Sequence, residues 1–351
     1  MDPNPSRRRS LGRVLAKVVL ALAVLHTAAL FGWAAVHALI GDGAWWSFLL
    51  NTFALYLFAP LVLTIPLALL LRSRLMQLCA IAGVMLFLVT YGALFVPPAL
   101  RPAVAADAPR LRAMTFNVLM TNVDPAGVVA ALRRSGADLI GLQEANPGVV
   151  EALRRDLSGI YPYQVVGDLI GRSRLVLLSR YPLQIVKVAL PGQWTDVPLV
   201  ARMRFAGATV TVLDAHPVST DITIEGMNEE TRQRAYTANV IAGFVRAQMG
   251  PVVMLSDFNC GDQSTPYGIV TRVLGDAWRE GGFGPGGTFP GGDSPGNSRP
   301  RVFGRLVPQW LVRIDYVFHS RHWRTVDARI GPWDGVSDHR PVLATLALTE
   351  R

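Results

Sequence analysis

Polar side chains that can bind metals or move protons recur at the ends of short apolar runs after residue 111. They are Asn117, Glu144, His216, Asp257, Asn259, Asp338 and His339. Each of them alone would more commonly be a solvated surface group. Strand ends cluster at one rim of a sheet, so we expect these side chains to lie together. Carboxylates, amides and imidazoles in one place suit a hard cation, either Mg²⁺ or Mn²⁺.

The elements that must position these residues follow the pattern of an α/β domain. Apolar, β-rich runs predict strands at 111–116, 138–142, 175–179, 209–213, 252–255, 313–318 and 342–348. The strand at 313–318 carries a further acidic residue, Asp315. Helical patterns cover 128–135, 147–158 and 229–248. The sequence therefore predicts a domain over 111–351 in which strands and helices alternate irregularly.

Seven segments of this domain resemble the endonuclease/exonuclease/phosphatase superfamily, whose fold is DNase I-like. In chain order they are MTFNV (114–118), DLIGLQEA (138–145), LLSRYP (177–182), DAHP (214–217), MLSDFN (254–259), RIDYVF (313–318) and SDHRPV (337–342). Their order is that of the superfamily, and together they cover nearly the whole domain. The resemblance implies a four-layer α/β sandwich with two packed mixed sheets, here in a membrane-anchored bacterial branch.

The resemblance also implies roles for individual residues. Glu144 would be the principal metal ligand, with Asn117 beside it and Asp338 in support. Asp257 and Asn259 would bind or orient the scissile phosphate and the attacking water, or a second metal. His339 would be the general base, oriented by Asp315, and His216 would donate a hydrogen bond or a proton on the leaving-group side.

Phosphate ester chemistry accounts for these residue types. A bound cation neutralises the charge that repels a nucleophile, and an imidazole can take a proton from water near neutral pH. A carboxylate behind the imidazole fixes its tautomer.

Two departures from the superfamily pattern narrow the choice of branch. Leu119 stands where the abasic-site endonucleases have an acidic residue, and His216-Pro217 replaces a tyrosine-containing motif. The chain therefore looks closer to the DNase I, sphingomyelinase and inositol-phosphatase side. The sequence leaves the acidic partner of His216 open, with Asp168 and Asp214 as candidates.

An arginine on a predicted helix is a further candidate for the site. Arg234 follows His216 within the helix at 229–248 and could reach a substrate phosphate, as could Asn259. The alternative is a solvated basic helix face.

The first 100 residues predict a membrane anchor. Three stretches without charged residues, at about 18–40, 45–71 and 75–97, are each long enough to cross a bilayer as a helix. Pro60 and Pro66 are expected to kink the second helix. Residues 101–110, rich in Ala and Pro, read as a short linker.

Basic residues set the expected orientation. Five lie in the N-terminal tail and two, Arg72 and Arg74, follow the second stretch, whereas the loop at 41–44 has none. The positive-inside rule then places the N-terminus in the cytoplasm. Three crossings would deliver the second domain to the extracytoplasmic side of a bacterial inner membrane.

Charge bears on the substrate. The chain carries a net charge of +9, but the residues after 107 contribute only about +4, and only Lys17 and Lys187 are lysines. We therefore expect a metal-dependent phosphoric ester hydrolase acting on a phosphodiester or phosphomonoester, lipid-borne or nucleotide. The alternatives are a nuclease acting on DNA or RNA and an inactive tethered binding module.

Overall fold

Two units make up the chain. The structure, a computed structural model, describes residues 5–168, 174–219, 223–292, 299–302 and 304–350. Its contacts divide the chain into Met1–Ala93 and Leu94–Arg351. Residues 94–110, expected to be the end of the anchor and a linker, therefore belong to the second unit. Each unit is described by itself.

The first unit consists of apolar helices: α1 (Pro5–Ile40), α2 (Trp45–Thr52), α3 (Ala54–Leu57), α4 (Leu61–Leu70) and α5 (Arg74–Tyr91). Two apolar stretches, Gly12–Ile40 and Arg74–Phe95, are long enough to cross a membrane. The chain from Trp45 to Leu70 would be a third crossing if its two bent parts form one span. Two or three of the predicted spans are thus present as apolar helices.

The largest bend in the middle stretch lies before both prolines, where the helical axis turns by 73° between Thr52 and Ala54. A second interruption, between Leu57 and Leu61, does lie at Pro60, whereas α4 continues through Pro66. The buried Asn51 offers a physical reason for this position. Its amide donates to Asp42 (2.6 Å) and accepts from the Trp33 indole (3.1 Å), which ties the end of α2 to α1 and to the loop after it.

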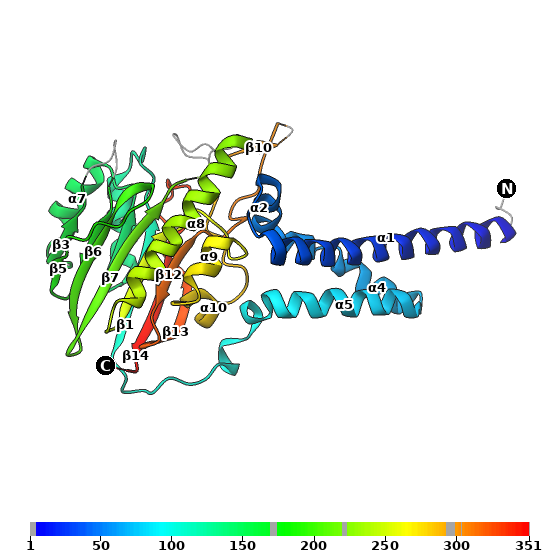
Figure 1. Cartoon of the computed structure of the whole chain (residues 1–351), viewed down its shortest axis with the longest axis horizontal. Coiled ribbons are helices and arrows are strands. Elements are labelled where there is room, and N and C mark those ends of the chain that lie inside the picture. Colours follow the sequence, from blue (N-terminus) through cyan, green and yellow to red (C-terminus); the bar gives the residue numbers. More distant parts are fainter. Residues whose placement is uncertain (1–4, 169–173, 220–222, 293–298, 303, 351) are drawn as a thin grey trace. The chain divides into compact units, whose positions relative to one another are not determined.

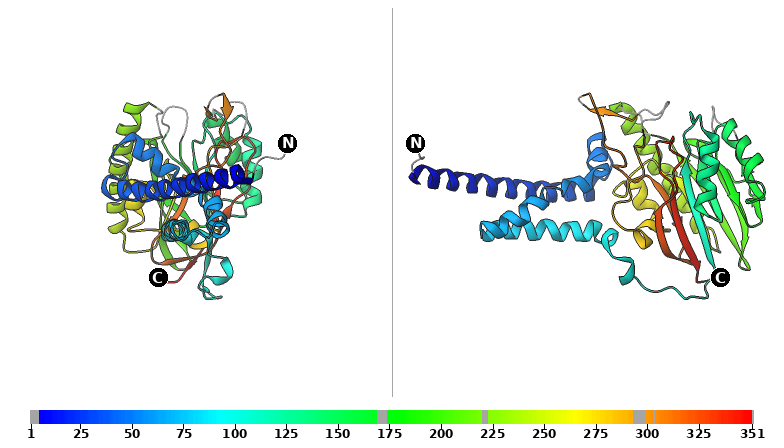
Figure 2. Two further views of the ribbon diagram at one scale, coloured as in Figure 1. Left: turned by 90° about the vertical axis from the view of Figure 1, so that its right-hand side faces the viewer. Right: turned by 180° about the vertical axis from the view of Figure 1, so that it is seen from behind.

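The second unit contains two six-stranded sheets (Figures 1 and 2). The first sheet has the order β13 (Trp323–Ile330), β14 (Val342–Leu348), β1 (Arg110–Asn117), β2 (Leu139–Gln143), β4 (Val176–Ser179), β3 (Tyr163–Val166). The second has the order β5 (Leu183–Ile185), β6 (Trp194–Phe205), β7 (Ala208–Pro217), β8 (Val252–Asp257), β12 (Asp315–His319), β9 (Gly275–Asp276). Each sheet holds one parallel pair, β1 with β2 and β7 with β8, among antiparallel neighbours.

Helices cover the outer face of each sheet. Helices α6 (Pro125–Ser135) and α7 (Pro147–Leu157) pack apolar side chains on the first sheet. Helices α8 (Ile224–Arg246) and α9 (Thr265–Val270) do the same on the second. The inner strands β1, β2, β7 and β8 bring the two sheets into contact. The four layers agree with the predicted sandwich, and a short helix α10 (Ala277–Gly281) and a hairpin, β10 (Arg301–Val302) with β11 (Arg305–Leu306), are added to them.

Candidate active site

The two parallel strand pairs bring the predicted residues to one rim. Parallel strands end on the same side, so Asn117 and Glu144 follow β1 and β2 together, and His216 and Asp257 lie together at the ends of β7 and β8. The sheets meet at this rim, where the Asn117 amide donates to Asp257 Oδ2 across the two layers (2.9 Å). The strand-end pattern of the sequence thus gathers one site.

Glu144 forms the open side of this site. Its carboxylate accepts from the Asn117 amide (3.0 Å) and from the Met120 backbone N–H (2.9 Å), and its side chain stays 22% exposed. Glu144 has φ 58° and Asn259 has φ 52°, an uncommon left-handed conformation for residues other than glycine. Such conformations are retained where the surrounding structure enforces them, commonly at functional sites.

His339 and Asp315 form the first of two histidine–carboxylate pairs. The antiparallel register of β12 with β8 sets Asp315 opposite Asp257. His339 Nδ1 lies 2.9 Å from Asp315 Oδ2, and its Nε2 lies 3.7 Å from Asp257 Oδ2. Ser337 fixes this loop, because its hydroxyl donates to the Asn117 carbonyl (2.7 Å) and accepts from the His339 N–H (3.0 Å).

His216 and Asp196 form the second pair. His216 Nδ1 lies 2.8 Å from Asp196 Oδ2, and the two residues are cross-strand neighbours on β7 and β6. Asp196 was not among the partners predicted for His216. Of the two that were, Asp168 is exposed, and the Asp214 carboxylate accepts instead from Gln143 (2.7 Å). The sequence offered one weak signal for Asp196, the run Thr-Asp-Val-Pro, in which the proline interrupts the strand pattern.

Negative charge dominates the centre of the site. Burial alone would lower the pKa of both histidines, but the carboxylates around them have the larger opposite effect. The charges of Asp315 and Asp257 raise the pKa of His339 to about 10. The hydrogen bond to Asp196 and the charge of Asp257 likewise raise the pKa of His216 well above its ordinary value. For Asp257, burial alone would raise the pKa, but the two neighbouring imidazoles hold it well below its usual range.

These residues fit a divalent cation. Two groups, Glu144–His216–Asp257 and Asp257–Asp315–His339, hold their ligand atoms within 4.8 Å of one another. His216 Nε2 is buried without a hydrogen-bond partner among the described residues and lies 3.4 Å from Asp257 Oδ2. Hard oxygen ligands with an adjoining imidazole suit Mg²⁺ or Mn²⁺. The Asn117 amide nitrogen faces the carboxylates here, so only its oxygen, now bound by the Leu119 N–H, could be a ligand.

The remaining predicted residues lie around this centre. Asp338 is partly buried, belongs to neither group of ligands among the described residues, and has a pKa that burial raises. Asn259 donates its side-chain amide to the Pro217 carbonyl (3.1 Å). Arg234 is 1% exposed and donates to the carbonyls of Val218 and Ser219 (both 3.3 Å). Asn259 and Arg234 therefore hold the chain that leaves β7 just after His216, and Arg234 is not on a solvated helix face.

Comparison with known proteins agrees with this geometry. The model of the Endonuclease/Exonuclease/phosphatase family matches residues 114–339, about two thirds of the chain. Among curated proteins, no sequence gives a significant match.

Solved structures share the fold of the second unit. An endonuclease/exonuclease/phosphatase from Beutenbergia cavernae DSM 12333 is 21% identical, with a TM-score of 0.50, covering 68% of this chain and 72% of its own. One from Bacteroides vulgatus is 20% identical, with a TM-score of 0.51, covering 68% and 99%. D. rerio TDP2, solved with a single-strand DNA product, is 16% identical, with a TM-score of 0.53, covering 68% and 98%. Identities this low establish the fold alone.

Proposed function

Because the chain belongs to the endonuclease/exonuclease/phosphatase family, we propose that it is a membrane-anchored, metal-dependent phosphoesterase. It hydrolyses a phosphodiester or phosphomonoester at the extracytoplasmic face of a bacterial inner membrane. One observation carries the proposal: two histidine–carboxylate pairs direct their Nε2 atoms at Asp257, beside the partly open carboxylate of Glu144. An inactive binding module would have no need of this set.

The residues divide the work of in-line hydrolysis. A cation beside Asp257 would offset the negative charge that raises the pKa of His339, and the neutral imidazole then takes a proton from the attacking water at Nε2. Asp315 on Nδ1 fixes the tautomer and stabilises the imidazolium. His216, held in the same way by Asp196, donates a hydrogen bond or a proton to the leaving oxygen. A cation would be held by Glu144 and Asp257, with Asn117 and Asp338 in support, and would neutralise charge at the phosphate and polarise a non-bridging oxygen.

Two residues serve the substrate side of the site. Asn259 adjoins Asp257, and its backbone N–H donates to Asp257 Oδ1 (3.1 Å), so it orients the phosphate together with that carboxylate. Arg234 acts indirectly, because its guanidinium binds the backbone carbonyls of Val218 and Ser219 and not the substrate. Arg234 is therefore proposed here as a positioning residue for the substrate-binding edge rather than as a direct phosphate contact.

Substrate class is the first prediction. A nuclease gains affinity from many basic groups along the phosphate backbone, whereas the residues after 107 carry a net charge of only about +4. We expect the full-length protein with Mg²⁺ to turn over lipid-borne or small phosphoesters faster than duplex DNA. Reconstitution in vesicles that contain the lipid substrate should raise its turnover at least about tenfold over detergent-dispersed protein, because tethering raises the effective concentration.

Nuclease action is the second candidate function, and the TDP2 structure with its single-strand DNA product is the observation that favours it. The same assay decides between the two. If both preparations cut DNA or RNA efficiently and leave every lipid and small phosphoester intact, the protein is a nuclease. Glu144→Gln serves as the blank in each arm, so that a contaminating hydrolase is recognised.

Orientation is the second prediction. Arg72 and Arg74 lie in the loop before α5, and the remaining basic residues of the anchor lie mainly in the N-terminal tail. A C-terminal alkaline phosphatase fusion should therefore be active, and a C-terminal fluorescent protein that matures only in the cytoplasm should stay dark. The same fusions placed after residue 72 should give the opposite pattern. Reversed results would refute the orientation and leave the enzymatic proposal standing.

A further inference from the structure

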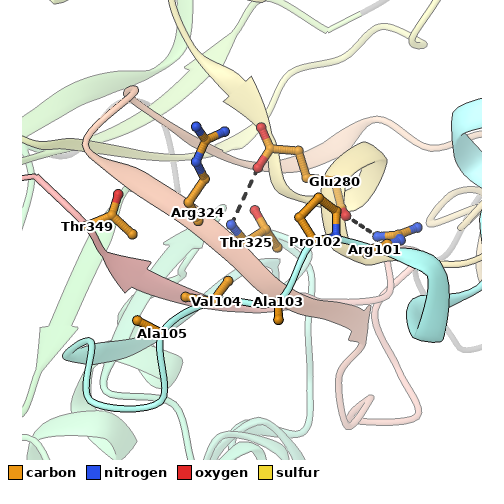
Figure 3. A pocket seen from close by; sticks show the side chains of 9 residues that line it. All are labelled: Arg101, Pro102, Ala103, Val104, Ala105, Glu280, Arg324, Thr325 and Thr349. Carbon is orange, nitrogen blue, oxygen red and sulfur yellow. Dashed lines mark hydrogen bonds between the residues drawn. The ribbon is translucent and has the colours of Figure 1, made fainter.

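The chain that leaves the third apolar helix is bound by the second unit. We call residues 94–105 the tether. The Arg101 guanidinium donates to the carbonyl of Glu280 (Figure 3) and to that of Gly282. The Leu94 carbonyl accepts from the Gly284 N–H (2.7 Å). The Phe95 ring packs edge-on against Phe283, with centroids 6.2 Å apart. The tether therefore docks on α10 and the residues after it.

This docking depends on few contacts. Between the extended part of the tether and strand β13 lies a hollow of about 560 Å³, whose lining includes Arg101, Glu280, Arg324 and Thr325 (Figure 3). The Glu280 carboxylate crosses toward β13 and accepts from the Thr325 N–H (3.4 Å). The tether is thus fastened at Arg101 and near Leu94, and is not packed along its whole length.

A glycine-rich segment runs from this docking point to the proposed base. We call residues 282–291 the bridge segment. Trp278 on α10 donates to the Gly284 carbonyl (2.9 Å), and a Cβ at Gly286 would strike the Trp278 ring. A Cβ at Gly287 would strike the carbonyl of Trp310. The segment is mostly buried without being helix or strand, so its path depends on these close contacts.

The far end of the bridge segment touches the proposed base pair. The Thr288 hydroxyl accepts from the backbone N–H of Asp315 (3.4 Å), and the Thr288 carbonyl accepts from the Arg340 N–H (2.9 Å). The Phe289 ring lies 5.0 Å from the His339 imidazole, centroid to centroid. One short segment thus contacts both members of the pair at one end and the tether at the other.

We propose that the tether is a positioning element for catalysis: Arg101, docked on the backbone of Glu280 and Gly282, fixes the bridge segment and through it the His339–Asp315 pair. This inference rests on the proposed function, because it assigns a consequence to the placement of the base. Arg101 contacts no group of the site and acts only through the backbone. The membrane-proximal chain then contributes to catalysis and does more than attach the domain to the membrane.

The test uses the full-length protein with Mg²⁺. Arg101→Ala should lower kcat about tenfold with KM within about twofold, since misplacing a base weakens the chemical step while leaving substrate contacts intact. Arg101→Lys should recover only part of the rate, because an ammonium ion lacks the planar fork that reaches two carbonyls. Arg324→Ala is the matched control: Arg324 is exposed and lines the same hollow, and the variant should keep the wild-type rate.

Amide hydrogen exchange supplies a readout that does not need activity. The amides of Thr288 and Phe289 donate to the Val312 carbonyl (2.7 and 3.0 Å), and that of Gly284 donates to the tether. Arg101→Ala should speed exchange at all three positions, and Arg324→Ala at none. Faster exchange confined to Gly284, or unchanged kcat despite faster exchange at Thr288 and Phe289, overturns the proposal. If wild-type protein hydrolyses no phosphoester, the proposed function fails, and exchange at Thr288 and Phe289 alone decides whether the tether reaches the pair.

Discussion

Replacement of Glu144 by Gln should strongly slow hydrolysis and remove the stabilisation that a metal ion gives to the fold. The Glu144 carboxylate is 22% exposed, whereas His216 and Asp257 in the same group of ligands are buried, and an amide of the same shape removes its charge while keeping its size. A bound cation contributes several kcal/mol to transition-state stabilisation, so we expect a loss of about a thousandfold in kcat. Steady-state rates against Mg²⁺ concentration, and thermal midpoints with Mg²⁺ and with chelator, measure the two effects.

Glu151→Gln is the matched control for this experiment. Glu151 is exposed on α7 in the same unit, and its replacement makes the same change in charge and shape away from the site. That variant should keep wild-type rates and the wild-type rise in thermal midpoint with Mg²⁺. Full activity of Glu144→Gln in excess chelator would exclude a metal-dependent mechanism built on this carboxylate.

The sequence was sufficient to find the rim, for a physical reason. Asn117, Glu144 and Asp257 each follow an apolar run, and two parallel pairs of these strands bring their ends together. The strand at 342–348 was predicted to the residue, because a long apolar run led by the Ser-Asp-His-Arg-Pro segment leaves little choice of boundary. Strand-end patterns therefore carry site information even where the exact register is unknown.

Asp196 shows where such reasoning stops. Strand β6 contains Pro198, and its pairing with β7 shifts register between Asp196 and Leu199, so no regular alternation marks it as a strand. The Asp196 carboxylate is brought to the candidate site only by its cross-strand neighbour His216, 20 residues away in the sequence. The role proposed for residues 94–105 was missed for a similar reason. Residues up to 97 were predicted to end a span and residues 101–110 to form a linker, whereas the Arg101 side chain binds backbone carbonyls far along the chain.

In the anchor, prolines predicted the helix bends only in part. Pro60 lies at the break before α4, but α4 continues through Pro66, and the large bend lies next to the buried Asn51. The position of a proline can be read from the sequence. Whether a polar side chain such as Asn51 links two helices depends on which helices pack together, and the sequence does not show that. Asp42, Asn51 and Trp33 come from three separate elements of the unit.

The two histidines should respond differently to the leaving group of the substrate. His339→Asn removes the proposed base, and the loss, about a thousandfold in kcat, should be the same for alkyl and nitrophenyl phosphoesters. His216→Asn removes the proposed proton or hydrogen-bond donor. Nitrophenolate departs without protonation, so this loss should be large for alkyl esters and should shrink to roughly tenfold or less for nitrophenyl esters.

Asp315 and Asp196 extend the same test to the carboxylates behind the imidazoles. Each lies within 2.9 Å of Nδ1 of its histidine, so its effect on the reaction depends on the imidazole being present. Asp315→Asn combined with His339→Asn should be no slower than His339→Asn alone, since residues that act as a unit are not additive. His322→Asn, away from the site, controls for loss of an imidazole. Equal leaving-group sensitivity in the His339 and His216 variants would remove the distinction between base and acid, and the two pairs would then have to be regarded as equivalent supports of the central carboxylate Asp257.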